Sequence, residues 1–217
     1  MNLIILGPQG SGKGTQAEML AKKFNLIHVD MGKELRQAAA EKSSFGRKLN
    51  KIVNHEKKLV SDRIIEKVLQ RKFKNIPKGK GIILDGSPRR VEQIDEVEGT
   101  FRIAKRDINK VIYINIPMKE SVKRISRRYH CSRCQKNLVL GKDIKSAKGQ
   151  CPDCGGKVEQ REDDTPEGIR KRLNIFRKDT IPVLKIYEKN GMLLEINGKN
   201  NIKNVFKNIV NKLKSKK

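Results

Sequence analysis

Residues 7–15 combine closely spaced glycines with one lysine, a set of residue types that can bind phosphate. The segment reads Gly-Pro-Gln-Gly-Ser-Gly-Lys-Gly-Thr and fits the phosphate-loop pattern G-x-x-x-x-G-K-[ST], except that Gly14 stands where Ser or Thr is usual. Glycines let backbone N–H groups turn toward phosphate oxygens, and the lysine of this pattern reaches the β- and γ-phosphates. The sequence therefore predicts a nucleotide phosphate site formed by Gly10, Ser11, Gly12, Lys13, Gly14 and Thr15.

The four cysteines of the chain form two Cys-x-x-Cys pairs, Cys131 with Cys134 and Cys151 with Cys154, separated by 16 residues. This spacing is typical of zinc ribbons, in which each pair supplies two thiolates to one ion. A disulfide framework is the competing interpretation, but no sequence feature directs the chain to an oxidising compartment. We therefore expect a structural zinc ion with four thiolate ligands and no open position for a substrate.

Short apolar segments, each followed by a helical pattern, must position these groups. They are four to seven residues long and apolar at consecutive positions, as in strands buried on both faces of a parallel sheet. The expected strands are residues 2–6, 26–29, 81–84, 110–116 and 192–196. Amphipathic patterns between and after them predict helices over 15–24, 62–73, 118–128 and 166–190.

This alternation predicts an α/β fold with a doubly wound, five-stranded parallel sheet of the P-loop NTPase type. Two segments interrupt the alternation. Residues 31–60 carry two short helical patterns, and residues 129–164 contain all four cysteines, and we interpret both segments as inserts. The core would then consist of residues 1–30, 61–128 and 165–217.

Composition limits the possible classes of protein. The chain has 217 residues and a formal net charge of +26, so one medium-sized domain and anionic partners are expected. No apolar run approaches the ~18–20 residues of a membrane-spanning helix, and Leu3–Leu6 is too short for a signal peptide. We expect a cytoplasmic protein without a membrane partner. The basic runs lack interleaved aromatic residues, which favours a lysine-rich solvated surface over a nucleic-acid-binding face.

The phosphate loop also resembles a particular family. Its Gly-x-x-Gly-x-Gly-Lys-Gly-Thr-Gln sequence is similar to that of adenylate kinases and related nucleoside-monophosphate kinases. Residues 32–36 (Gly-Lys-Glu-Leu-Arg), 58–62 (Lys-Leu-Val-Ser-Asp) and 85–89 (Asp-Gly-Ser-Pro-Arg) resemble further motifs of that family. The resemblance extends from Leu3 to about Leu213.

The resemblance implies that the insert at 31–60 binds the phosphate acceptor, AMP. Arg36 and Arg89 would bind its phosphate, and Gln93 would hydrogen-bond the adenine edge. Asp85 would hold Mg²⁺ through water, and the peptide bond before Pro88 would be cis. The residues implied for AMP binding are Met31, Arg36, Lys58, Leu59, Val60, Gly86, Ser87, Pro88, Arg89, Gln93, Arg161 and Arg172.

The resemblance also implies that the zinc-binding insert at 129–164 is a lid over ATP. Arg124 and Arg128, on the helix that enters the lid, would cover the base and phosphates, and the backbones of Asn137 and Leu138 would lie near ATP. Besides the phosphate loop, the implied ATP-binding residues are Arg124, Arg128, Asn137, Leu138 and Asn200. The implied catalytic set is Lys13, Arg36, Asp85, Arg89, Arg128, Arg161 and Arg172.

Three positions depart from the family pattern. Met31 removes a hydroxyl that caps a helix, Lys33 replaces an acid near the Mg²⁺ site, and Ser87 replaces a phenylalanine. The implied reaction is ATP + AMP ⇌ 2 ADP, catalysed by a monomer. The alternatives are a kinase for UMP, CMP or GMP, a nucleic-acid-binding P-loop NTPase, and an impaired kinase homologue that retains a binding role.

Overall fold

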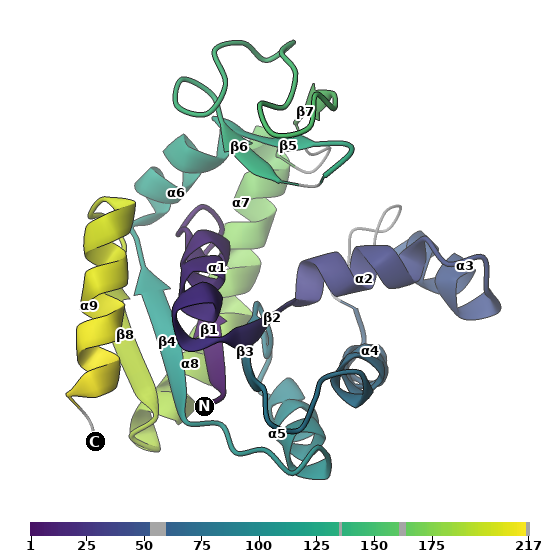
Figure 1. Ribbon diagram of the computed structural model, residues 1–217, viewed down its shortest axis with the longest axis vertical. Coiled ribbons are helices and arrows are strands. Elements are labelled where there is room, and N and C mark those ends of the chain that lie inside the picture. Colours follow the sequence, from purple (N-terminus) through teal and green to yellow (C-terminus); the bar gives the residue numbers. More distant parts are fainter. Residues whose placement is uncertain (53–59, 135, 161–163, 216–217) are drawn as a thin grey trace.

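The chain folds around a parallel sheet in the order β2-β3-β1-β4-β8, shown in the computed structural model of Figure 1. The structure describes residues 1–52, 60–134, 136–160 and 164–215. All four pairings between neighbouring strands are parallel, which confirms the predicted fold class. The strands are β1 (Leu3–Leu6), β2 (Leu26–Asp30), β3 (Gly81–Asp85), β4 (Lys110–Asn115) and β8 (Leu193–Asn197).

Helices cover both faces of this sheet because its strands are apolar on both faces. Alternate residues of β1 belong to different clusters: Leu3 and Ile5 pack on one side, and Ile4 and Leu6 on the other. The first cluster is completed by α1 (Lys13–Phe24) and α9 (Ile202–Lys214). The second is completed by α4 (Asp62–Lys74), α5 (Gln93–Ile103) and α8 (Ile181–Lys189).

The predicted helix over 118–128 is too long by one turn. Helix α6 spans Met118–Ile125, and Arg128 begins strand β5 (Arg128–Cys131). Ser126 ends the helix with its hydroxyl bonded to the Lys123 carbonyl. Arg128 is then paired in a second, antiparallel sheet, so the expectation that it lies on the entering helix was wrong. The partners of β5 are β6 (Asn137–Val139) and β7 (Val158–Glu159).

The predicted helix over 166–190 is one continuous rod with an irregular turn inside it. It consists of α7 (Pro166–Ile175), a π-helical turn η2 (Phe176–Thr180) and α8. Pro182 has no N–H to donate to the preceding turn, so the regular helical hydrogen-bond pattern cannot pass through this point. The widened turn places Thr180 in the core, where only 3% of the residue is exposed.

The two predicted inserts lie beyond the carboxyl ends of the strands (Figure 1). In the first, α2 (Met31–Ala39) packs against α3 (Ser44–Asn50). In the second, the β6-β5-β7 sheet encloses a small cluster that includes Leu138 and Val158. The boundaries 31–60 and 129–164 remain predictions. None of the helices in the described ranges combines the length and apolarity needed to cross a bilayer.

Candidate functional site

The phosphate loop connects β1 to the first turn of α1. Gly10 and Gly12 adopt positive φ angles of 76° and 87°, which residues with a Cβ rarely adopt. A Cβ at Gly7 would lie 2.7 Å from the Ile114 carbonyl oxygen, so the loop packs closely on β4. Gly12 also precedes α1 without a capping side chain, which leaves the first N–H groups of the helix available to an anion.

Lys13 interacts electrostatically with Asp85, which ends strand β3. The pKa of Lys13 is lowered to about 8, mainly by burial and also by the charges of Arg89 and Arg128, against the opposing effect of Asp85. A Cβ at Gly14 would lie 3.4 Å from Asp85 Oδ2, so the glycine that departs from the usual pattern lies directly beside this carboxylate. The site therefore brings the amine of the phosphate loop and a buried acid together.

The surroundings of Asp85 fit a hydrated Mg²⁺ ion. Asp85 is only 5% exposed, and its Oδ1 has no hydrogen-bond partner among the described residues. A buried carboxylate oxygen without a partner can accept a hydrogen bond from a water molecule on the ion. The chain's own residues thus leave one acceptor open at the position where the resemblance implies a metal.

His28 is a member of the site that the sequence reasoning missed. Its Nε2 lies 3.4 Å from Asp85 Oδ2. Burial lowers the pKa of His28, but the interaction with Asp85 and the charge of Asp30 outweigh burial and raise this pKa overall. The available signal was a single polar residue within the apolar strand Leu26–Val29.

Arg89 is fixed from several directions at the turn after β3. Its Nε donates to the Gly86 carbonyl at 2.8 Å, and its backbone N–H donates to Gln93 Oε1 at 2.8 Å. The Thr180 hydroxyl donates to the Arg89 carbonyl at 3.0 Å. Burial lowers the pKa of Arg89, and the charges of Arg172 and Arg36 add to this effect while Asp85 opposes it. Several cations are therefore close enough to repel one another.

The start of α2 compensates for Met31. Asp30 is the N-cap residue, and its Oδ1 accepts a hydrogen bond from the Lys33 backbone N–H at 3.0 Å. The helix therefore keeps a capping side chain, and Met31 instead fills the core, where it is 1% exposed. Arg36 is exposed on the same helix.

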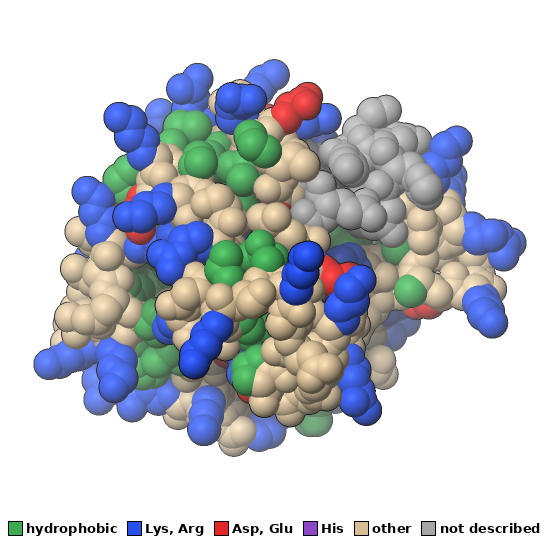
Figure 2. All heavy atoms as spheres, turned by 90° about the horizontal axis from the view of Figure 1, so that it is seen from above, with side chains coloured by type: hydrophobic (Ala, Val, Ile, Leu, Met, Phe, Trp, Pro, Cys, Tyr) green, Lys and Arg blue, Asp and Glu red, His purple; other side chains and the backbone are tan. Residues whose placement is uncertain are grey.

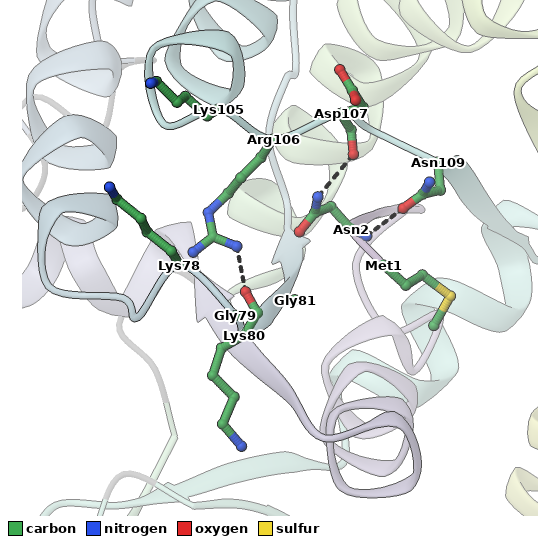
Figure 3. A pocket seen from close by; sticks show the side chains of 10 residues that line it. All are labelled: Met1, Asn2, Lys78, Gly79, Lys80, Gly81, Lys105, Arg106, Asp107 and Asn109. Atoms are coloured by element: carbon green, nitrogen blue, oxygen red, sulfur yellow. Dashed lines mark hydrogen bonds between the residues drawn. The ribbon is translucent and has the colours of Figure 1, made fainter.

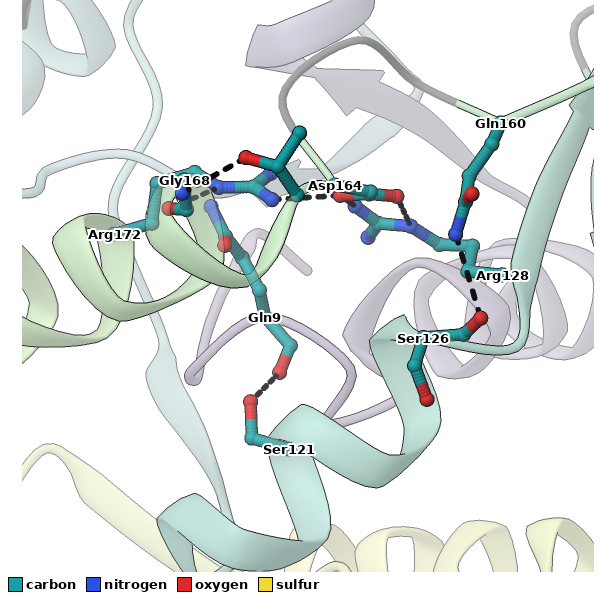
Figure 4. Close-up of polar contacts among 9 residues, drawn as sticks. Gln9, Ser121, Ser126, Arg128, Gln160, Asp164, Gly168 and Arg172 are labelled. Carbon is teal, nitrogen blue, oxygen red and sulfur yellow. Dashed lines mark hydrogen bonds and ion pairs between the residues drawn. The ribbon is translucent and has the colours of Figure 1, made fainter.

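On the lid side, Asp164 binds two of the predicted phosphate-binding arginines (Figure 4). Arg128 donates to both carboxylate oxygens at 2.9 and 2.6 Å, and Arg172 Nη2 donates to Oδ1 at 2.6 Å. Burial raises the pKa of Asp164, but the two arginines outweigh burial and hold it below its ordinary value. Arg124 binds Glu120 at 2.6 Å and lies near the Gly10 carbonyl of the phosphate loop.

The remaining predicted residues are in different surroundings. Lys58, Leu59 and Arg161 lie outside the described residues. Asn200 is exposed after β8, and Asn137 is exposed on β6. Two of the predicted residues, Val60 and Leu138, are buried in hydrophobic clusters. Three more are buried in the turn after β3: Gly86, Ser87 and Pro88. The Ser87–Pro88 peptide bond is cis, as the resemblance implied.

The four cysteines come together as the spacing predicted, with all four Sγ atoms within 4.8 Å of one another. Cys131 Sγ lies 3.4 Å from Cys154 Sγ, and Cys134 Sγ lies 3.7 Å from Cys151 Sγ. A tetrahedral zinc–thiolate site has sulfur–sulfur distances of about 3.8 Å. The Cys134 and Arg133 N–H groups donate to Cys131 Sγ and, together with the Cys154 and Cys134 thiols, lower the pKa of the Cys131 thiol to about 6. The neighbouring thiols raise the pKa of Cys134 instead. This donor set fits zinc.

Comparisons with known proteins agree with this geometry. A family model described as adenylate kinase matches residues 5–192. The adenylate kinase of Thermosipho africanus is 36% identical over 211 residues, which cover 97% of this chain and 98% of that protein. This chain belongs to the adenylate kinase family.

Other members of the adenylate kinase family are related to it over a similar length. The adenylate kinase of Dehalococcoides mccartyi is 37% identical over 213 residues and that of Methanothrix thermoacetophila is 34% identical over 209 residues, and the matches cover 98% and 96% of each chain, respectively. The resemblance inferred from the phosphate loop is therefore confirmed. For an adenylate kinase of this kind, the zinc assignment depends on the cysteine geometry described above.

Proposed function

We propose that this protein catalyses the reversible, Mg²⁺-dependent transfer of a phosphoryl group from ATP to AMP, giving two ADP. One observation carries the proposal: Lys13 of the phosphate loop and Arg89 of the acceptor side both interact electrostatically with the single carboxylate of Asp85. A donor and an acceptor phosphate bound at these two cations would meet end to end. Family membership supports the same reaction.

In the proposed reaction an oxygen of the AMP phosphate attacks the γ-phosphorus, and the bond between this phosphorus and the bridging oxygen of ADP breaks. Charge spreads over the transferred group, so catalysis depends on positioning and on neutralising cations. In this proposal Lys13 and Arg89 neutralise that charge, with Arg36, Arg128, Arg161 and Arg172 as further cations. Bound Mg²⁺ would neutralise charge on the phosphates of ATP, and Asp85 would orient its water.

The acceptor base is proposed to be adenine. Gln93 Oε1 is occupied by the Arg89 N–H, so the Gln93 amide group is directed to donate, as adenine ring nitrogens require. Ser87 supports a second candidate, a kinase whose acceptor carries another base. The residue is 2% exposed, and its hydroxyl has no hydrogen-bond partner among the described residues. A UMP, CMP or GMP base has additional polar groups that could use this hydroxyl.

A nucleic-acid-binding role is less well supported. Figure 2 shows lysine and arginine side chains scattered over one face, both at its rim and in its middle, without a continuous track. Aromatic residues, which stack on bases in single-strand binders, make up 4% of the sequence. We also propose a structural zinc ion in the lid, a monomeric state and a cytoplasmic location. The monomeric state depends on the family resemblance alone.

The decisive experiment is a coupled assay of ADP formation from ATP with AMP, UMP, CMP or GMP, together with metal analysis of the purified protein. We expect AMP to be phosphorylated fastest, and only in the presence of Mg²⁺. A faster reaction with another monophosphate would show that this monophosphate, and not AMP, is the preferred acceptor. ATP hydrolysis stimulated by DNA or RNA, without phosphorylation of any monophosphate, would contradict the proposal.

A further inference from the structure

Arg106 is buried at the end of the central sheet where β1, β3 and β4 begin, opposite the end that carries the phosphate loop. The residue is 8% exposed. Its guanidinium donates to three backbone carbonyls, those of Pro77 at 2.8 Å, Ile76 at 3.4 Å and Lys80, whereas its Nε has no partner among the described residues. Within residues 1–52, 60–134, 136–160 and 164–215, no carboxylate forms an ion pair with Arg106. Burial of a charge without a counter-ion is unfavourable, so a bound anion would stabilise this arrangement.

The guanidinium lies at a pocket of about 230 Å³ (Figure 3). Lys78, Lys80 and Lys105 also line this pocket, which gives it four basic residues. The three ammonium groups point away from the guanidinium in Figure 3, and that of Lys80 donates to Asn25 Oδ1. Asp107 is the acidic residue of the lining, and its carboxylate points away from Arg106 in Figure 3. The local charge is therefore strongly positive, well beyond what the one nearby acid can balance.

The backbone that carries two of these cations is unusual. Lys105 has φ 55°, in the left-handed region, and occupies the position after α5 where glycine is preferred. The Lys105 N–H bonds to the Arg102 carbonyl at 2.8 Å, and the Arg106 N–H bonds to the Phe101 carbonyl at 2.9 Å. A lysine in this conformation costs about 1 kcal/mol relative to glycine. Strained positions of this kind concentrate at functional sites, and here the strained turn presents two adjacent cations.

We propose that this pocket binds a small phosphate-bearing anion of the size of inorganic pyrophosphate. Planar guanidinium donors suit phosphate oxygens, and the flexible lysine side chains can turn toward them. The pocket is too small for a nucleic-acid backbone, which needs an extended basic track. It is separated from the phosphate loop by the whole length of β1, so it would constitute a second, independent anion site.

The test is a titration of the full chain with inorganic pyrophosphate at physiological ionic strength, followed by NMR. Resonances of the Gly79 and Lys105 amides and of the Arg106 Nε–H report on this pocket separately from the phosphate loop. We expect them to shift and to reach saturation. If they do not move while the resonances of Gly10 and Gly12 do, the proposal is wrong, whatever the outcome for the kinase activity.

Lys105→Gly is the informative variant, since glycine suits the left-handed turn and the substitution removes the lysine side chain with its charge. We expect it to unfold no more easily than the wild type and to bind pyrophosphate at this pocket about three- to fivefold more weakly. Lys207→Ala, which removes an exposed lysine from α9, is the control with the same change in net charge and should bind as the wild type does. Equal affinity of Lys105→Gly and the wild type would overturn the proposal, as would tighter binding of a single-stranded oligonucleotide at the same resonances.

Discussion

Arg128 donates two hydrogen bonds to Asp164, through Nε to Oδ2 at 2.9 Å and through Nη2 to Oδ1 at 2.6 Å. The Asp164 side chain is fully buried, whereas 17% of the Arg128 side chain is exposed. A cation proposed to bind phosphate is therefore held by a carboxylate in the ligand-free protein. Nucleotide binding would have to compete with this ion pair or add to it.

Replacing Asp164 by asparagine should destabilise the protein strongly at neutral pH. Arg128 and Arg172 would both lose their buried counter-charge, and breaking such a pair costs about 3 kcal/mol. The lowered pKa of Asp164 means that its contribution is present above the unfolded-state pKa and is lost as the pH falls through the folded-state pKa. Urea unfolding of both proteins should therefore give a difference that is large at pH 7 and shrinks in acid.

Asp153→Asn is the matched control, since Asp153 pairs with Lys136 at a site where 46% of the Asp153 side chain is exposed. Its effect on the free energy of unfolding should stay below about 1 kcal/mol. An effect of Asp164→Asn below about 1 kcal/mol, as expected for Asp153→Asn, would show that the buried arginine pairs do not stabilise the fold.

The affinity for ATP should fall as the pH rises above about 8. Lys13 has its pKa lowered to about 8, and phosphate binds the protonated amine more tightly than the neutral one. Linkage then predicts a loss of about tenfold per pH unit above this pKa, until the pKa of the bound state is reached. Calorimetric titration with ATP between pH 7 and 9.5 measures this loss of affinity, and the Lys13→Arg variant is the comparison. The arginine variant should show no such fall, and parallel curves for the two proteins would contradict the assignment.

Thr180→Val should weaken AMP binding more than ATP binding. The Thr180 hydroxyl donates to the Arg89 carbonyl, and the substitution removes this bond while leaving the volume nearly unchanged. The KM for AMP should rise about three- to tenfold, since one hydrogen bond contributes about 1 kcal/mol, while the KM for ATP changes little. Thr100→Val is the control: Thr100 is similarly buried but bonds to the Glu96 carbonyl within its own helix. A rise in both KM values would argue against a specific effect on Arg89.

Removing the metal should unfold the lid and leave the central sheet intact. The small cluster around Leu138 and Val158 depends on cysteine side chains for part of its packing, so zinc would supply much of its folding energy. Metal analysis should find one zinc per chain. In a Cys151→Ser variant the Leu138 amide should exchange with solvent much faster, while the Ile83 amide of β3 serves as the internal control. Unchanged protection of Leu138 in a metal-free protein would contradict the zinc assignment.

The sequence was sufficient for the central sheet because each strand is a short, mainly apolar run, and in β1 all four residues are buried. It was not sufficient at residues 126–128, where helix-compatible residues turn into strand β5 because tertiary pairing with Asn137–Val139 is available. The Asp164 pairs were also not predictable, since Arg128 lies 36 residues away in the chain and only the folding of the lid brings them together. His28 was missed because its partner Asp85 lies on another strand.

The Asp30 carboxylate caps α2, so no hydroxyl is needed there, and the side chain of the next residue, Met31, packs in the core. The capping role that the resemblance assigned to residue 31 is therefore filled by the preceding residue, Asp30. Column-by-column comparison would therefore record a lost contact here where the folded molecule has an equivalent one.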